Sequence, residues 1–241
     1  MKNRKILSLT VLLMLLSLTA LWPFRYEIRL LYNLTIQSPS NVDEINKNSV
    51  WGLDISHYQG EVEWPKFNSF NIPDFVFIKA TEGKTYKDEK YKDYKINFQN
   101  KGVPVGAYHF FTITSSGEDQ AKEFIRFAGL KKGDLFPVLD FEIECEDSKE
   151  YVITQIKSYI TTIENHYGVK PIIYCNYDLA VEYIPDINNM VIWAADYHFE
   201  PNCNYTFWQQ TSEFRHSSFS TNVDFNTFNI EEYKLSNYII R

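Results

Sequence analysis

Short apolar runs alternate with longer segments of mixed polarity along most of this chain. Eight such runs follow residue 49, and each has the length of a strand. Apolar runs bounded by turn residues are typical of strands that are buried on both faces. We therefore predict strands at 50–56, 75–81, 103–111, 135–143, 171–176, 191–197, 205–211 and 220–226.

Helical periodicity separates the earlier runs. Apolar residues recur at intervals of three and four in 118–130 and 148–167, and Gly168 follows the second segment as a stop signal. Shorter helical stretches are predicted at 88–100 and 177–183.

The last three predicted strands lie too close together for crossover helices, and the intervals contain turn residues such as Pro201 and Ser217. Alternating strands and helices indicate a parallel sheet. The sequence therefore predicts an α/β fold for residues 49–241, a TIM-like, parallel-strand barrel of eight strands with an irregular closing segment. Five β/α units would come first, followed by three strands with few helices and with hairpin-like or irregular connections.

A leucine-rich segment precedes this body. Lys2, Arg4 and Lys5 come before an uncharged run of seventeen residues, 6–22. That length is near the lower limit for a helix that crosses a bilayer. The basic start predicts a cytoplasmic N-terminus and export of the remainder.

Two interpretations of this segment stay open. A cleaved signal peptide needs a small-x-small site, and the best candidate, ending at Ala20, is followed by bulky Leu21 and Trp22. We favour an uncleaved signal-anchor or transmembrane segment at 1–24 with a polar tether at 25–48. The domain would then lie outside the cytoplasm on the cell membrane, or be secreted if the segment is cleaved.

Charge and composition indicate which classes of ligand the protein can bind. The net charge is −7, yet residues 1–40 carry five bases and one acid, so the body is more acidic than the total suggests. An acidic body argues against nucleic acid as a partner. Aromatic residues reach 17%, which favours a surface that stacks on flat groups.

Polar residues stand where the predicted strands end. In a barrel of parallel strands these ends form one rim, where active sites lie. The residues concerned are Asp54, Lys79, Tyr108, His109, Asp140, Glu142, Tyr174, Trp193, Asp196, Gln209 and Asp224.

The sequence Asp140–Phe141–Glu142 is the most informative of these ends. Residues i and i+2 of a strand face the same side, so both carboxyls would enter one cleft with backbones about 6.6 Å apart. Neighbouring carboxyls raise each other's proton affinity, and one can stay protonated while the other is ionised. Cleavage of a glycosidic bond needs that division of roles.

Other chemistries find no support in the sequence. There is no HExxH, Gly-rich phosphate loop or GxSxG motif, and the five histidines lack metal-ligand spacing. We therefore expect neither a metal nor a cofactor. Cys145, Cys175 and Cys203 lack CxxC spacing and could form at most one disulfide.

Eight short strings along residues 50–230 together resemble one known family, the glycoside hydrolase family 25 muramidases, or lysozymes of the Chalaropsis type. They occur in the family's order: GLDISHYQG at 52–60, FVFIKATEG at 75–83, VGAYHFF at 105–111, PVLDFE at 137–142, IIYCN at 172–176, VIWAADY at 191–197, FWQQT at 207–211 and VDFN at 223–226.

The resemblance implies an enzyme that cuts the β-1,4 bond between N-acetylmuramic acid and N-acetylglucosamine in peptidoglycan glycan strands. By position in these strings, Glu142 resembles the general acid and Asp140 the partner that orients the substrate's 2-acetamido group. Asp54 and Asp224 are similar to two further acids of the cleft. The family's barrel has five β/α units plus three strands, in agreement with the spacing.

Further roles follow by position. Tyr108, Tyr174 and Trp193 resemble the aromatics that line the sugar sites, while Lys79, Asp196 and Gln209 are candidate substrate contacts, with Lys79 also a candidate partner of a cleft acid. His57 and His109 are expected to support the site, and Trp208 to lie in the core.

Two other functions stay open: a glycan-binding pseudoenzyme on the same fold, and a hydrolase of another N-acetylated glycan such as chitin. The complete set of four acids favours the active enzyme. We expect a monomer that works in cell-wall turnover. The sequence leaves the stereochemical outcome open, retaining or inverting.

Overall fold

The computed structural model describes residues 38–142, 147–187 and 189–241. The predicted membrane segment at 1–24, residues 25–37 of the predicted tether and Cys145 lie outside these ranges. Within the described ranges, no helix combines the length and the apolar character needed to cross a bilayer.

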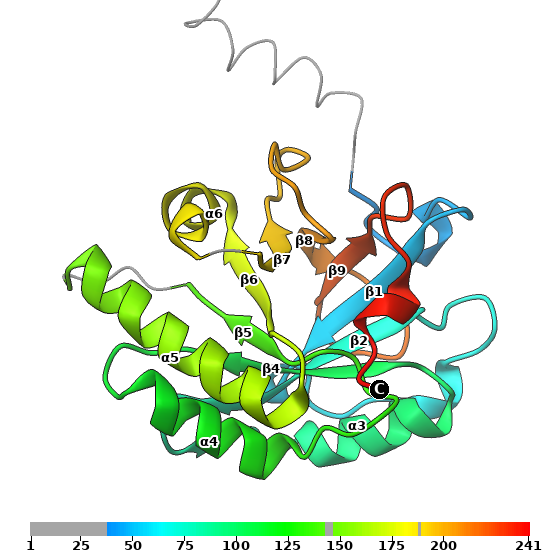
Figure 1. Cartoon of the computed structure of the whole chain (residues 1–241). Coiled ribbons are helices and arrows are strands. Elements are labelled where there is room, and N and C mark those ends of the chain that lie inside the picture. The colour runs from blue at the N-terminus through cyan, green and yellow to red at the C-terminus, as the bar shows by residue number, and fades with distance from the viewer. Residues whose placement is uncertain (1–37, 143–146, 188) are drawn as a thin grey trace, which may run out of the picture. The chain divides into compact units, whose positions relative to one another are not determined.

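Eight strands close into a barrel in the described part of the chain (Figure 1). The order is β1-β9-β8-β7-β6-β5-β4-β2, and β2 pairs again with β1. The prediction of eight barrel strands is confirmed. Their bounds are β1 Val50–Ile55, β2 Phe75–Glu82, β4 Val105–Phe110, β5 Val138–Asp140, β6 Ile172–Asn176, β7 Val191–Ala195, β8 Phe207–Phe214 and β9 Val223–Phe228.

The predicted hairpin-like closing segment is found between β8 and β9. Their connection spans only residues 215–222, and β9 runs antiparallel to both β8 and β1, so the barrel is not wholly parallel. Strands β7 and β8 still pair parallel. Strand β3, Tyr86–Lys87, was not predicted; it has two residues and pairs with the end of β2.

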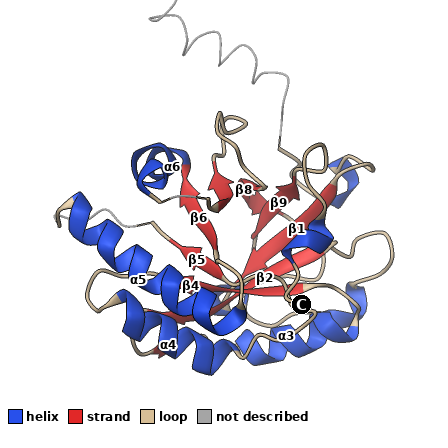
Figure 2. Ribbon diagram, viewed as in Figure 1, coloured by secondary structure: helices blue, strands red, loops and turns tan. Residues whose placement is uncertain are grey.

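Helices cover the outer face of the barrel (Figure 2). Those described are α3 Tyr91–Asn100, α4 Gly117–Ala128, α5 Lys149–Tyr167 and α6 Tyr177–Tyr183, with short 3-10 helices η2 Val42–Glu44, η3 His57–Gln59, η4 Trp64–Lys66, η5 Ile184–Asp186 and η6 Leu235–Tyr238. The connection from β1 to β2 contains η3 and η4 and no α-helix. Only four of the five predicted β/α units therefore contain an α-helix, and the first does not.

Local signals explain the helix bounds. The Ser116 and Ser148 hydroxyls accept the backbone N–H groups of Asp119 and Tyr151 at the starts of α4 and α5. Gly168 ends α5 in the left-handed conformation, with φ of 71°, as its place in the sequence predicts. Helix α3 starts at Tyr91, three residues later than predicted.

Side chains alternate between two cores. One set of side chains faces the helices, as Leu53, Val76 and Val105 do. In β1 and β4 this set has odd residue numbers, and in β2 it has even ones. The opposite positions fill the barrel interior around Phe75 and Phe77. This interior core occupies one end of the barrel and leaves the other end to polar residues.

Glycine makes room for the interior aromatic rings. A Cβ added at Gly52 would lie 2.4 Å from the Phe75 ring, and one at Gly106 would lie 2.4 Å from the Phe77 ring. The chain after β9 returns beneath the barrel, where the Tyr238 ring of η6 contacts Phe207 and Phe228 at centroid distances of 5.8 Å. The segment after Asn229 therefore ends in a 3-10 helix that caps the interior core.

Candidate active site

Four carboxyls from three strands meet at the polar end of the barrel. Asp54 of β1 is paired in register with Asp224 of β9, and Asp140 of β5 with Tyr174 of β6. They line an open cavity of about 220 Å³. Its walls are Asp54, Ser56, Tyr58, Lys79, Tyr108, Phe110, Asp140, Glu142, Tyr174, Trp193, Tyr197, Gln209 and Asp224.

The prediction that Asp140 and Glu142 share one cleft is confirmed. Both line the cavity, whereas the Phe141 ring turns to the outer core and packs edge-on against Tyr183 at 5.1 Å between centroids. The strand itself ends at Asp140, so Glu142 stands just beyond it and is exposed, while Asp140 is buried. The two carboxyls thus share a cleft in different solvent environments.

Asp54 is held by two amides. Its Oδ2 atom accepts hydrogen bonds from Asn226 Nδ2 at 2.7 Å and Gln209 Nε2 at 3.0 Å. Burial raises the pKa of Asp54 to about 6, although both hydrogen bonds favour the ionised form and act in the opposite direction. Asp54 is therefore mostly an anion at neutral pH.

The amides are themselves oriented by aromatic residues. Tyr174 and Tyr197 each donate a hydroxyl hydrogen bond to Gln209 Oε1, at 2.9 and 2.7 Å. The Trp193 indole Nε1 donates to Asn226 Oδ1 at 2.8 Å. This network fixes which face of each amide turns to Asp54. The sequence analysis missed Asn226, although the string VDFN places it two residues after Asp224 and thus on the same side of β9.

The other two aspartates favour the neutral form. Burial, reinforced by the charges of Glu142 and Asp54, raises the pKa of Asp140 well above its usual range. Its buried Oδ1 atom has no hydrogen-bond partner in the described part of the protein. Burial and the charges of Asp54 and Glu142 raise the pKa of Asp224 to about 9. Two of the four cleft carboxyls therefore favour the protonated form at neutral pH.

Two candidate polar contacts lie differently from expectation. Lys79 lines the cavity, but its Nζ pairs with Glu82 Oε2 at 2.6 Å, a residue that the sequence analysis did not single out as a cleft acid. Asp196 does not line the cavity, and its Oδ1 accepts the backbone N–H groups of His198 and Phe199 in the next turn. Contact of either residue with substrate stays a prediction.

The predicted sugar-site aromatics line the floor of the cavity. Tyr174 and Trp193 are buried and point their polar atoms into the amide network, and Tyr108 is partly buried. The more exposed aromatic side chains of the cavity wall are Tyr58 and Tyr197, both missed by the sequence analysis. Tyr58 lies two residues after the predicted strand 50–56, and Tyr197 is the last residue of the predicted strand 191–197. Their position at the ends of predicted strands is the signal that could have identified them.

The remaining candidates are structural. His109 faces the outer core, where its ring nitrogens lie 2.7 Å from Thr81 Oγ1 and 3.1 Å from Gln120 Oε1, and burial lowers its pKa to about 4. Trp208 is buried as expected and donates to the carbonyl of Asp196. Cys175 and Cys203 are free thiols within the described residues. No group of three or more potential metal ligands is found among those residues.

The sequence profile of the family described as Glycosyl hydrolases family 25 matches residues 53–224, which span all four acids and most of the barrel. The chain belongs to this family. The match begins one residue before Asp54 and ends at Asp224, so it brackets the cleft. The predicted resemblance is therefore confirmed.

Relatives of this family 25 chain support the assignment. It is 31% identical over 202 residues to Lysozyme M1 of Streptomyces globisporus, covering 76% of this chain and 68% of that protein. It is 27% identical over 254 aligned positions to the uncharacterized protein YegX of Escherichia coli K12, covering 94% and 91%. A family 25 glycosyl hydrolase structure from Bacillus anthracis superposes with a TM-score of 0.71 at 32% identity, covering 81% and 95%.

Proposed function

We propose that this protein is a lysozyme, an N-acetylmuramidase that hydrolyses the β-1,4 bond between N-acetylmuramic acid and N-acetylglucosamine in peptidoglycan. The convergence of Asp54, Asp140, Glu142 and Asp224 in one open cavity carries the proposal. The lysozyme relative and the family 25 hydrolase structure support it.

Glu142 is the general acid in this proposal. It is the exposed carboxyl of the cleft, so a glycosidic oxygen can reach it, and Asp140 beside it favours the protonated form. Glu142 donates its own proton to the leaving oxygen, and Asp140 takes no part in that transfer. Asp140 orients the 2-acetamido group of the substrate, because its Oδ1 atom has no hydrogen-bond partner in the described part of the protein and can accept the acetamido N–H.

Asp54 supplies the negative charge. Its carboxylate is ionised at neutral pH and held in place by two amides, so it stabilises the positive charge that develops on the sugar ring. Asp224 lies beside it and is mostly neutral at that pH. The charge of the cleft is therefore limited, and the substrate does not meet four carboxylates at once.

The proposed stereochemical course is retention through the substrate's own acetamido oxygen. The carboxyls of the described cleft already have other roles in this proposal, which leaves the acetamido oxygen as the nucleophile. Proton NMR during hydrolysis should show the β-anomer as the first product. The α-anomer as first product would exclude this route.

We also propose that residues 1–24 anchor the enzyme in the cell membrane, with the barrel outside the cytoplasm acting on the cell's own wall. The basic start and the uncharged run of seventeen residues support this proposal. Membrane fractionation of cells expressing the full chain, with N-terminal sequencing, tests it. A soluble exported product that starts after Ala20 would contradict the anchor.

One experiment tests the activity and the bond choice together. The full chain is incubated with peptidoglycan and with chitin oligomers, and the new reducing ends are identified. We expect N-acetylmuramic acid at the reducing end of the peptidoglycan products. Cleavage of chitin alone would indicate another glycan hydrolase, and binding without cleavage would indicate a pseudoenzyme.

Two variants assign the acid. Glu142→Gln should bind glycan and lose turnover by about two to four orders of magnitude, the usual contribution of general acid catalysis. Glu164→Gln, on the exposed outer surface of α5, is the matched control and should keep full activity. Near-normal turnover of Glu142→Gln would remove Glu142 from this role.

A further inference from the structure

An exposed aromatic ring stands on the rim of the active-site cavity. Tyr58 lies in η3, immediately after β1, and 74% of its surface is exposed. Its ring nevertheless lines the same cavity as the four acids. Exposed apolar surface that continues a binding cavity marks a region that a ligand can cover.

The backbone beneath Tyr58 is held on both sides. The Ser56 hydroxyl accepts the Tyr58 N–H at 3.3 Å, and Gln59 Oε1 accepts the Ser56 N–H at 2.8 Å, which together form a capping box around η3. The Tyr94 hydroxyl donates to the carbonyl of Gly60. Tyr58 is therefore presented by a short, fixed segment, and little backbone order is lost when a ligand covers it.

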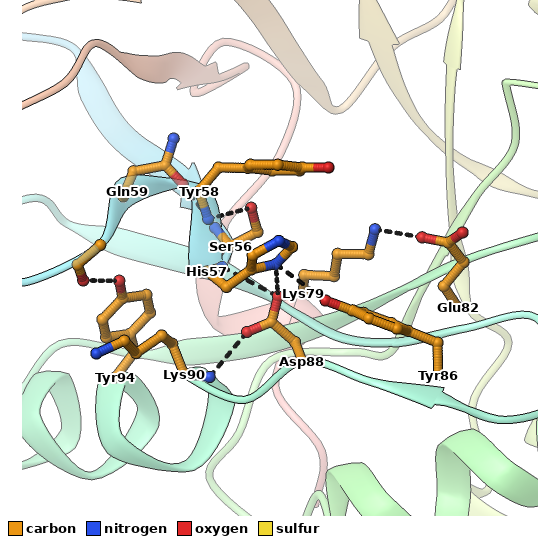
Figure 3. A network of polar contacts seen from close by, with 11 residues as sticks. Ser56, His57, Tyr58, Gln59, Lys79, Glu82, Tyr86, Asp88, Lys90 and Tyr94 are labelled. Carbon is orange, nitrogen blue, oxygen red and sulfur yellow. Dashed lines mark hydrogen bonds and ion pairs between the residues drawn. The ribbon is translucent and has the colours of Figure 1, made fainter.

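His57 supports the Tyr58 ring from below (Figure 3). The two ring centroids lie 4.1 Å apart with an interplanar angle of 35°. His57 Nδ1 lies 2.8 Å from Asp88 Oδ2 and 3.1 Å from the Tyr86 hydroxyl, and the Asp88 side chain is fully buried. Asp88 also accepts the backbone N–H of His57 at 3.0 Å, so this contact fixes the imidazole ring in orientation.

The contact with Asp88 also selects the tautomer. A carboxylate accepts the proton of Nδ1, which leaves a lone pair on Nε2 when the ring is neutral. Nε2 has no hydrogen bond within the described part of the chain, and Figure 3 shows it on the side of the imidazole that faces Tyr58. An acceptor thus lies next to an exposed aromatic face.

We propose that Tyr58 and His57 form a sugar platform, a binding site for a saccharide unit of the glycan strand outside the pair that is cleaved. The apolar face of the pyranose stacks on the face of the Tyr58 ring that is turned away from His57, and a hydroxyl or acetamido N–H that reaches past the ring edge donates to His57 Nε2. This inference rests on the proposed function for the identity of the glycan. It adds the path that the glycan takes on the protein beyond the four acids.

The charges near the sugar platform favour a sugar over a stem peptide. Lys79 is paired with Glu82, and Lys90 is paired with Glu61. Neither lysine is left to bind the carboxylate of a peptide without breaking an ion pair. A neutral pyranose ring requires only the aromatic face and the acceptor nitrogen.

The test compares long and short substrates. The full chain hydrolyses three substrates: peptidoglycan strands stripped of their stem peptides, strands that keep them, and the smallest oligosaccharide that the wild type cleaves. Tyr58→Ala should lower kcat/KM on the long strands by about tenfold, since an aromatic stacking contact is lost. It should leave the short substrate unaffected, and Tyr58→Phe, which keeps the ring, should resemble the wild type.

Phe70→Ala is the matched control, because Phe70 is 91% exposed and does not line the active-site cavity. It should leave both rates unchanged. Unchanged hydrolysis of long strands by Tyr58→Ala would overturn the sugar platform. An equal loss on both substrates would also overturn it, and a loss seen only with peptide-bearing strands would assign the rim to the peptide.

A binding measurement separates this proposal from the proposed activity. Calorimetric titration of peptide-free strands into Glu142→Gln should give an affinity about tenfold higher than into the Glu142→Gln, Tyr58→Ala double variant. If the wild type cleaves no glycan and this difference persists, the activity is wrong and the sugar platform stands. If the wild type is active and the affinities are equal, the sugar platform is wrong.

Discussion

Asn226 donates its side-chain N–H to Asp54 Oδ2 across 2.7 Å, from a position with no solvent exposure. The partner strands β9 and β1 carry the two residues, and the Trp193 indole fixes the orientation of the amide. A buried carboxylate without such a donor would be costly to ionise. Asn226 is therefore a positioning residue that keeps Asp54 charged.

Replacing Asn226 should shift the pH profile of activity. The Asn226→Ala variant loses a hydrogen bond to the ionised form of Asp54, so the pKa of Asp54 should rise above about 6. Activity should then fall more at pH 6 than at pH 8, which kcat/KM profiles measure. Gln210→Ala is the matched control, because this amide on β8 donates to Thr227 away from the cleft. A uniform loss at every pH would contradict the positioning role.

The wild-type profile itself should have two limbs. Protonation of Asp54 removes the stabilising charge, so activity should fall as the pH drops through about 6. Ionisation of Asp224 adds a second charge beside Asp54, so activity should fall again as the pH rises through about 9. Initial rates between pH 4 and 10 check this. In the Asp224→Asn variant the loss of activity near pH 9 should disappear. If that loss persists, another group causes it.

Asp224 should also reduce stability at neutral pH. Its pKa is about 9 in the folded protein and about 4 in an unfolded chain. Between these values the folded state binds more protons, so the free energy of unfolding falls as the pH rises. Asp224→Asn should stabilise the protein at pH 8 by about 0.5–2 kcal/mol and have less effect at pH 4. Urea unfolding at both pH values measures this, and equal effects would contradict the assignment.

Gly106→Ala should destabilise the barrel. The added Cβ would lie 2.4 Å from the Phe77 ring and 3.2 Å from Leu135 Cβ, so the interior core would have to shift. Overpacking of this kind costs about 1–3 kcal/mol, measurable by urea unfolding. The double variant Gly106→Ala, Phe77→Leu makes room for the methyl group. It should be more stable than additivity of the single variants predicts, and simple additivity would contradict the steric cause.

The barrel could be predicted because the alternation of apolar and polar residues is local. The same rule predicted that Asp140 and Glu142 share a cleft with Phe141 turned away, and this is found although the strand itself ends at Asp140. Alternation carries no information on strand direction, however, and β9 has the same pattern whether it runs parallel or antiparallel. The short spacing after β8 indicates a hairpin-like connection, but it does not say which of the last three strands reverses, and that depends on the complete sheet.

The site could be predicted only in part. Asp54 and Asp140 stand at the C-terminal ends of their strands and Glu142 just beyond, as the sequence predicts. Asp224 instead stands near the start of β9, and it reaches the same rim because β9 is antiparallel. The partner of Lys79 depends on how β2 turns towards β3, and the donors to Asp54 come from residues more than 150 positions away. Tyr58 belongs to a 3-10 helix, which has no apolar periodicity. Contacts of this kind arise from tertiary packing and leave little local signal.

The pairing of β1 with β9 has a consequence for how the protein matures. These strands are the earliest and the latest of the barrel, and Asp54 and Asp224 face each other across their seam. The ring cannot close until residues 223–228 have been synthesised, and the loop-closure entropy of so distant a pairing makes this step slow. A nascent chain is thus without a complete catalytic cleft throughout most of its translation.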